Sequence, residues 1–194
     1  MKKSIAVIGV LVSLMPMGQS LVIGSSAAFM SAAVILSVSE KVQAESASYY
    51  ATIGYMKWKD GNYYEAILNY SKAIEINPRY PGAYSFRADA RRKSGDHYGA
   101  IADFSKLIEM NPKDDFAYYN RGNVKTHLKD YDGAIADYSK AIEISPFFID
   151  AYKSRSIVKE QIFDIKGACL DAKKMVTLGD RDYENKQWIR KNCL

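Results

Sequence analysis

The sequence predicts an all-α protein built mainly from repeated pairs of helices. The phrase YSKAIEINP, which begins at residue 70, returns with small changes at residues 104 and 138, so that its closing prolines are 34 residues apart. Each period has, near its middle, a residue suited to start a helix. After that residue, apolar positions recur at the spacing of one helix face. Each 34-residue unit is therefore expected to be a helix, a tight turn and a second helix.

The closing prolines define the units when each is given unit position 32. Four units then occupy residues 47–80, 81–114, 115–148 and 149–180. The last unit is degenerate, because Asp180 stands where the others have proline. Position 16 holds Asn62, Asp96, Asp130 and Asp164. Their side-chain oxygens can accept hydrogen bonds from the unpaired amides of a starting helix. The second helix of every unit should therefore begin at the same place.

The residues at several recurring positions resemble those of the tetratricopeptide repeat family. In that family the 34-residue unit has an aromatic residue at position 4, glycine at 8, alanine at 20, an aromatic residue at 24 and proline at 32. Unit one has Tyr50, Gly54, Ala66, Tyr70 and Pro78 at these positions. The resemblance covers residue 47 to about residue 180. It implies a right-handed α-solenoid of about four helix pairs, whose first helices line a concave groove.

Arginine at position 7 accompanies aspartate at position 23. The pairs are Arg87 with Asp103, Arg121 with Asp137, and Arg155 with Asp171, whereas unit one has Ile53 and Asn69. Antiparallel helices joined near position 15 bring these two positions together. We therefore expect three partly buried ion pairs within the units. Surface charges that were copied independently by duplication are the alternative interpretation.

The residues from about 181 to 194 are expected to form a capping helix. Trp188 and Ile189 are apolar residues in a polar stretch, and a repeat array needs its last apolar face covered. Cys169 and Cys193 are about equally far from the expected turn before this helix, so they could form a disulfide. Position 21, which Cys169 occupies, is isoleucine in the other units, so a reduced core thiol is equally consistent with the sequence.

Residues 1–44 are expected to be a separate targeting segment, which leaves 45–194 as the repeat domain. Lys2 and Lys3 precede an uncharged stretch over residues 5–38, and a small-residue site ends at Ala44. This pattern resembles a secretory signal peptide cleaved after Ala44. The segment is long for a signal peptide, so a membrane anchor over residues 21–38 is the alternative. Either interpretation, combined with the repeats, resembles exported or membrane-anchored bacterial proteins, with the repeats in a periplasm, in a lumen or outside the cell.

Composition and motifs argue against an enzyme or a nucleic-acid-binding protein. Without residues 1–44 the chain has 24 basic and 21 acidic residues, and this net charge of about +3 without a basic cluster is too mild for nucleic acid. The two histidines fall at position 17, where sister units have tyrosine, and at a polar position 13, so neither is expected to be catalytic. No metal-ligand spacing and no glycine-rich phosphate loop is found. The sequence therefore predicts no catalytic residue, cofactor or metal.

The family resemblance implies a non-catalytic interaction module, such as an adaptor, scaffold or assembly factor, which holds a peptide or a partner helix in its groove. The candidate groove residues are Tyr55, Trp58, Phe86, Arg92, Tyr119, Asn120, Asn123, His127 and Lys153. Rings offer contact area, amides can bind a peptide backbone, and arginine can pair with a carboxylate. The chaperone-tail clamp of some relatives is not predicted, because only Asn120 fits its pattern. A structural spacer or homo-oligomer without a peptide ligand is the alternative.

Overall fold

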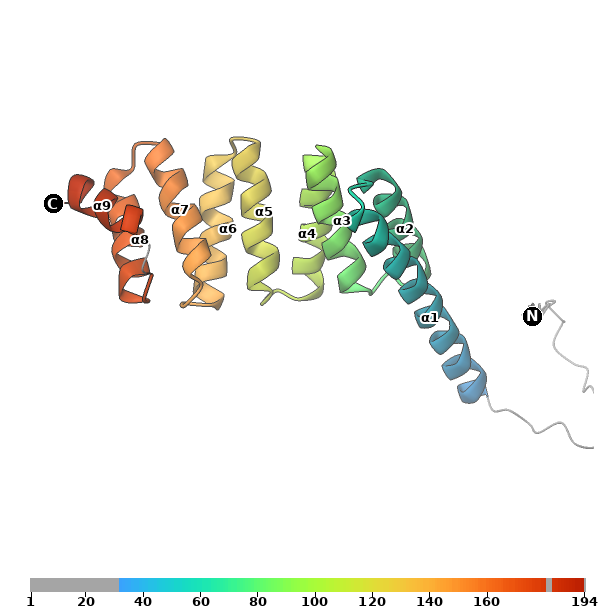
Figure 1. Ribbon diagram of the computed structural model, residues 1–194. Coiled ribbons are helices and arrows are strands. Elements are labelled where there is room, and N and C mark those ends of the chain that lie inside the picture. The colour runs from blue at the N-terminus through green and yellow to red at the C-terminus, as the bar shows by residue number, and fades with distance from the viewer. Residues whose placement is uncertain (1–31, 181–182, 194) are drawn as a thin grey trace, which may run out of the picture. The chain divides into compact units, whose positions relative to one another are not determined.

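The computed structural model describes residues 32–180 and 183–193, which form helices and no strand (Figure 1). The helices are α1 (Ala32–Lys59), α2 (Tyr63–Ile76), α3 (Pro81–Ser94), α4 (His97–Met110), α5 (Asp115–His127), α6 (Tyr131–Ile144), α7 (Ile149–Gln161), α8 (Ile165–Thr177) and α9 (Tyr183–Asn192). The chain is divided into two units, with the boundary after Ser37. The second holds most of α1 and all of α2 to α9.

Helix α1 continues through the predicted domain boundary. It runs without a break from Ala32 to Lys59, so Ala44, the predicted cleavage site, lies inside it. Residues 32–53 contain neither glycine nor proline, the two residues that most often end a helix. The anchor expected over 21–38 lies mostly outside the described residues. Among the helices that are described, none combines the length and apolar character needed to cross a bilayer.

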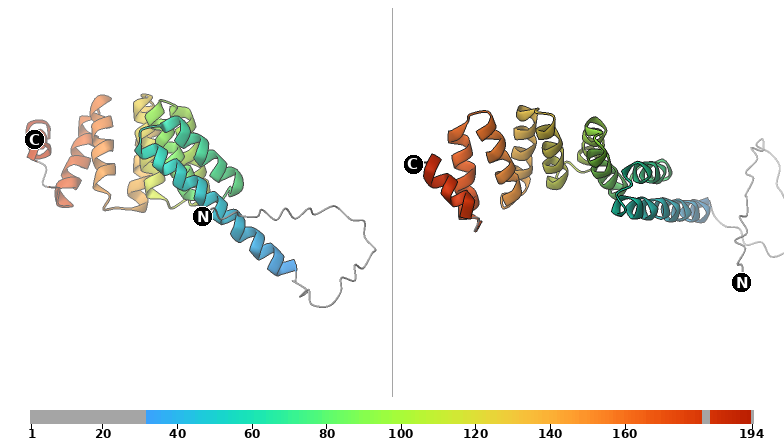
Figure 2. Two further views of the ribbon diagram at one scale, coloured as in Figure 1. Left: turned by 45° about the vertical axis from the view of Figure 1, so that its right-hand side comes forward. Right: turned by 45° about the horizontal axis from the view of Figure 1, so that its top comes forward.

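The prediction of an all-α solenoid of helix pairs is confirmed. From α2 to α9, each helix packs against the next in chain order (Figures 1 and 2). The four second helices, α2, α4, α6 and α8, begin after the predicted caps. The side chains of Asn62, Asp96, Asp130 and Asp164 each accept a hydrogen bond from the amide three residues later. These bonds satisfy amides that have no partner within the helix.

The turn before each of these caps uses a left-handed residue. Gly61 and Gly95 have φ of 75° and 89°, which glycine adopts without a steric penalty. Lys129 and Phe163 occupy the same place in units three and four, with φ of 61° and 64°. The last two units therefore make the same turn at a steric cost.

The core is built from small and aromatic residues of the second helices. The alanines of position 20 are fully buried, and so are the rings of Tyr70 and Tyr138 at position 24. A Cβ added to Gly122 would lie 2.8 Å from the ring of Tyr138, and one added to Gly54 would lie 2.9 Å from that of Tyr70. In units one and three, the close approach of the tyrosine ring to the facing helix therefore favours glycine at position 8, whereas units two and four have Ala88 and Ser156 there.

The structure brings together each predicted arginine and aspartate. In every pair, Nε and Nη2 of arginine donate to the two carboxylate oxygens, over 2.5 to 3.0 Å. Two further partners were not predicted. The Nη1 atoms donate to Ser71, Ser105 and Ser139 of the preceding units. A second cation, Arg91, Lys125 or Lys159, also contacts the aspartate. Each pair therefore joins the helices of one unit and that unit to its predecessor.

Helix α9 packs against α8 at the end of the solenoid. Trp188 and Ile189 contact the buried cluster that contains Met175. The indole Nε1 of Trp188 donates to Glu160 over 2.9 Å, and a disulfide joins Cys169 to Cys193, whose Cα atoms are 5.5 Å apart. The last helix is thus held to the fourth unit both by packing and by a covalent bond.

Candidate partner-binding groove

The predicted groove residues all lie on the first helices α1, α3, α5 and α7, and most of them line or adjoin two cavities. The aromatic pocket, of about 390 Å³, is lined by Ala51, Thr52, Tyr55, Tyr80, Gly82 and Phe86. The amide pocket, of about 350 Å³, is lined by Arg92, Asn120, Asn123, Thr126, His127, Tyr138, Ser154, Ile157 and Val158. Trp58, Tyr119 and Lys153 line neither pocket. Tyr119 packs on the rings of Tyr138 and Phe148, and Lys153 is exposed on α7.

Four rings form the wall of the aromatic pocket and its surroundings. Tyr55 stacks on Trp58, with centroids 6.1 Å apart, and meets the edge of Phe86 at 5.8 Å. Phe86 in turn stacks on the buried Tyr70 at 5.9 Å. Tyr55 and Phe86 remain 44% and 42% exposed. Because no charged side chain lines this pocket, it is suited to a large apolar group.

Asp89 connects the aromatic residues to Arg92. The indole Nε1 of Trp58 donates to Oδ2 of Asp89 over 2.8 Å, and Arg92 donates to Oδ1 from Nη2 over 2.5 Å and from Nε over 3.2 Å. Arg92 was expected to pair with a ligand carboxylate. The structure instead gives it a carboxylate from its own helix, α3, with which an anionic ligand would have to compete.

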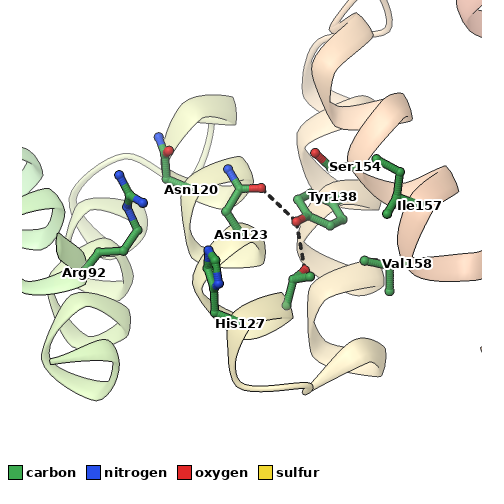
Figure 3. Close-up of a pocket in the computed structure, with 9 residues that line it drawn as sticks. Arg92, Asn120, Asn123, His127, Tyr138, Ser154, Ile157 and Val158 are labelled. Carbon is green, nitrogen blue, oxygen red and sulfur yellow. Dashed lines mark hydrogen bonds between the residues drawn. The ribbon is translucent and has the colours of Figure 1, made fainter. Parts of the chain in front are cut away.

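The amide pocket joins three first helices, with Arg92 on α3, Asn120, Asn123 and His127 on α5, and Ser154 on α7 (Figure 3). The buried hydroxyl of Tyr138 donates to Oδ1 of Asn123 over 2.8 Å and lies 3.0 Å from Oγ1 of Thr126. Burial raises the pKa of Tyr138 above its ordinary value, so this hydroxyl keeps its proton into the alkaline range. The amide of Asn123 is therefore held with its oxygen inward and its nitrogen available to the pocket.

The second amide of the pocket, that of Asn120, is free at its oxygen and bonded at its nitrogen. Nδ2 of Asn120 donates to the backbone oxygen of Phe116, one turn earlier on α5, over 2.9 Å. This leaves Oδ1 of Asn120 as an acceptor without a partner among the described residues. The two amides thus offer one acceptor and one donor on successive turns of a single helix.

The two histidines form a stack that was not predicted. His97 on α4 and His127 on α5 have parallel rings, with centroids 5.9 Å apart and an interplanar angle of 6°. Sequence reasoning treated them separately, since each histidine occurs in only one unit. Within residues 32–180 and 183–193, no group of three potential metal ligands is found.

Residues 47–80, 81–114 and 116–148 match models described as tetratricopeptide repeat. These matches cover just over half of the 194 residues, and the chain belongs to this family. The prediction of such repeats is confirmed for the first three units. A search of curated proteins finds no match.

Solved structures with the same fold include two structures of proteins named MamA. A crystal structure of MamA has a TM-score of 0.65 and 22% identity, over 84% of this chain and 99% of that chain. MamA 41-end from Desulfovibrio magneticus RS-1 has a TM-score of 0.68 and 19% identity, over 74% and 81%. The first TPR of Spaghetti (RPAP3), bound to the HSP90 peptide SRMEEVD, has a TM-score of 0.58 and 24% identity, over 61% and 94%. At these identities the likeness shows the fold alone.

Proposed function

We propose that this chain is a non-catalytic interaction module that holds a peptide or a partner helix in the groove formed by α1, α3, α5 and α7. The observation that carries this proposal is the pair of cavities on these helices, one bounded by exposed rings and the other by amides. Their volumes, about 350 and 390 Å³, fall within the range of ligand pockets. Exposed aromatic rings beside such cavities are typical anchors in protein interfaces.

Membership of the tetratricopeptide repeat family supports a scaffold or adaptor role, and one structure of the same fold holds a peptide. The peptide in that structure is an HSP90 segment. The same ligand is not proposed here, because among the positions of the chaperone-tail clamp only Asn120 fits. The partner should therefore be recognised by the chemistry of the two pockets of this chain.

We also propose that the repeats are exported or tethered to a membrane by residues 1–44. Lys2 and Lys3 before a long uncharged stretch support this proposal, and so does the bond between Cys169 and Cys193, since disulfides persist mainly in oxidising compartments. Fractionation followed by N-terminal sequencing tests it. A chain that begins at Glu45 indicates cleavage, and an intact chain in the membrane fraction indicates a tether. An intact chain with both thiols reduced in the cytosol would contradict the proposal.

Self-association without a peptide is a second candidate, favoured by large apolar side chains exposed outside both pockets. Phe147 and Phe163 are 80% and 88% exposed. Sedimentation equilibrium with Phe147→Ser and Phe163→Ser separates the two functions. A dimer that these substitutions dissociate would support self-association, whereas a concentration-independent monomer would exclude it.

Site-specific photo-crosslinking tests the groove directly. A photoreactive residue replaces Tyr55 or Asn120, which line the pockets, or Tyr98, which is 78% exposed on α4 and lines neither pocket. We expect the same partner to be captured from Tyr55 and Asn120 but not from Tyr98. If a partner is captured from position 98 but from neither pocket position, groove binding is disproved.

A further inference from the structure

We infer that the groove takes an extended, uncharged peptide segment with one large apolar side chain, rather than a partner helix or an acidic motif. This inference rests on the proposed function and narrows its ligand. Three features carry it: the free amide atoms of Asn120 and Asn123, the internal neutralisation of Arg92, and the apolar lining of the aromatic pocket.

The two asparagines of the amide pocket offer one acceptor and one donor to the same ligand. Oδ1 of Asn120 and Nδ2 of Asn123 are unused by the described residues, and the two side chains are one helical turn apart on α5. In an extended strand, the N–H and the C=O of one residue point to the same side, as in a hydrogen-bonded pair of a sheet. A helix has already used these groups in its own hydrogen bonds. The pair of amides is therefore matched to an extended backbone.

The hydrogen bond that holds the amide of Asn123 is not repeated in the other units. Tyr138 fixes the amide oxygen of Asn123, whereas the equivalent hydroxyl of Tyr70 is buried without a partner and the equivalent residue of unit two is Phe104, which has no hydroxyl. Only unit three of the described repeats thus combines a tyrosine hydroxyl at position 24 with an amide at position 9. Tyr138 acts as a positioning residue for Asn123.

The charges of the two pockets favour a neutral ligand. Arg92 is the only arginine, lysine, aspartate or glutamate in either lining, and Asp89 binds its Nε and Nη2. An acidic ligand would have to compete with this carboxylate, which the indole of Trp58 also holds in place. The remaining recognition is by hydrogen bonds in the amide pocket and by contact with Tyr55 and Phe86 in the aromatic pocket.

The probe is a phage-displayed library of random twelve-residue peptides, panned on the full-length protein. We expect selected peptides to be enriched in Trp, Phe, Tyr or Leu at one position, without an excess of Asp or Glu. Their affinity should change by less than about twofold between 50 and 500 mM salt, because screening acts on charges and not on apolar contact. Binding should be lost with Tyr55→Ser and retained with Tyr98→Ser.

A scan of single backbone N-methylations on the best peptide then tests the extended backbone. Methylation removes one N–H and leaves every side chain in place. We expect methylation at one position of the peptide to lower its affinity about tenfold, which is the effect of losing one good hydrogen bond. With Asn120→Leu, the same methylation should have no further effect, whereas methylation elsewhere should behave as in the wild-type protein.

The outcomes separate this inference from the function on which it rests. Selected peptides that are acidic and salt-sensitive, or that become helical on binding, overturn the inference while leaving groove binding in place if Tyr55→Ser still abolishes it. If no peptide binds the wild-type protein better than it binds the Tyr55→Ser variant, the proposed function fails as well.

Discussion

The guanidinium of Arg121 binds both carboxylate oxygens of Asp137, from Nε over 2.9 Å and from Nη2 over 2.7 Å. Its third nitrogen, Nη1, donates to Ser105 in the preceding unit over 2.9 Å. Lys125 adds a second cation to Asp137 at 2.8 Å, and the carboxylate is only 5% exposed. The hydrogen bonds from Arg121 to Asp137 raise the pKa of the arginine above its ordinary value, so the guanidinium keeps its charge.

Removal of one partner of this pair should destabilise the fold strongly. We expect Asp137→Ala to lower the free energy of unfolding by about 3 to 5 kcal/mol, since it leaves two cations without their carboxylate. Arg121→Ala should cost less, because Lys125 still faces Asp137. Urea unfolding measures both values, and Asp132→Ala, an exposed site on the same helix, is the control with a change below about 0.5 kcal/mol. A double variant whose losses simply add would show that the two side chains do not interact.

The two buried tyrosines of position 24 should respond differently to the loss of their hydroxyls. The hydroxyl of Tyr70 has no hydrogen-bond partner among the described residues, so Tyr70→Phe should leave stability unchanged or raise it slightly. Tyr138→Phe should cost about 1 to 2 kcal/mol, because Asn123 then loses the donor to its oxygen. Denaturant unfolding of both variants at pH 7 gives the comparison. Equal losses would argue against the hydrogen bond to Asn123.

The same tyrosines should make the protein sensitive to alkali. Burial raises the pKa of both Tyr70 and Tyr138 above the ordinary tyrosine value of 10.0. The folded state then keeps a proton that the unfolded chain releases, so stability is full below about pH 10 and falls as the pH rises toward the folded-state pKa. We expect the loss between pH 8 and pH 11 to be smaller in Tyr70→Phe than in the wild-type protein. Parallel stability curves for the two proteins would contradict this cause.

Reduction of the disulfide should loosen the end of the solenoid. Cys169 and Cys193 are separated by 24 positions, and a loop of this size corresponds to about 3 kcal/mol in the loop-entropy model. Hydrogen exchange with and without a reductant measures where this stabilisation acts. We expect the reductant to speed exchange in α9 and to change it little in α5 and α6. In the Cys193→Ser variant, which cannot form the disulfide, the reductant should have no effect on exchange. Unchanged exchange in α9 would show that the noncovalent contacts of Trp188 and Ile189 are enough to hold it.

The turn at Phe163 offers a substitution that should stabilise the protein. Phe163 has φ of 64° with its ring 88% exposed, whereas glycine occupies the same place in units one and two. Phe163→Gly should remove a steric cost of about 1 kcal/mol and loses almost no buried surface. Thermal unfolding measures the change, with Lys129→Gly as the matched variant in unit three. A lower melting temperature for both would refute the argument from strain.

Sequence reasoning worked where the molecule repeats itself. Arg121 and Asp137 could be paired because two sister units carry the same two residues and unit one lacks both. The serine partners at position 25 were missed, although the signal was present, since three units share that serine. Features that occur once gave no such signal. The contact of Asp89 with Trp58 and Arg92 depends on side chains from two different units, and no second copy of that combination exists to reveal it.

The serine at position 25 also bears on where the array stops. Ser71, Ser105 and Ser139 each receive an arginine from the unit that follows, so every link runs backward along the chain. In unit four this position is Lys173, a donor that contacts the backbone oxygen of Cys193 over 3.3 Å. A fifth unit would bring its arginine against a lysine. Lys173 therefore cannot accept the arginine of a further unit as the three serines do, and a design that lengthens the array would begin with Lys173→Ser.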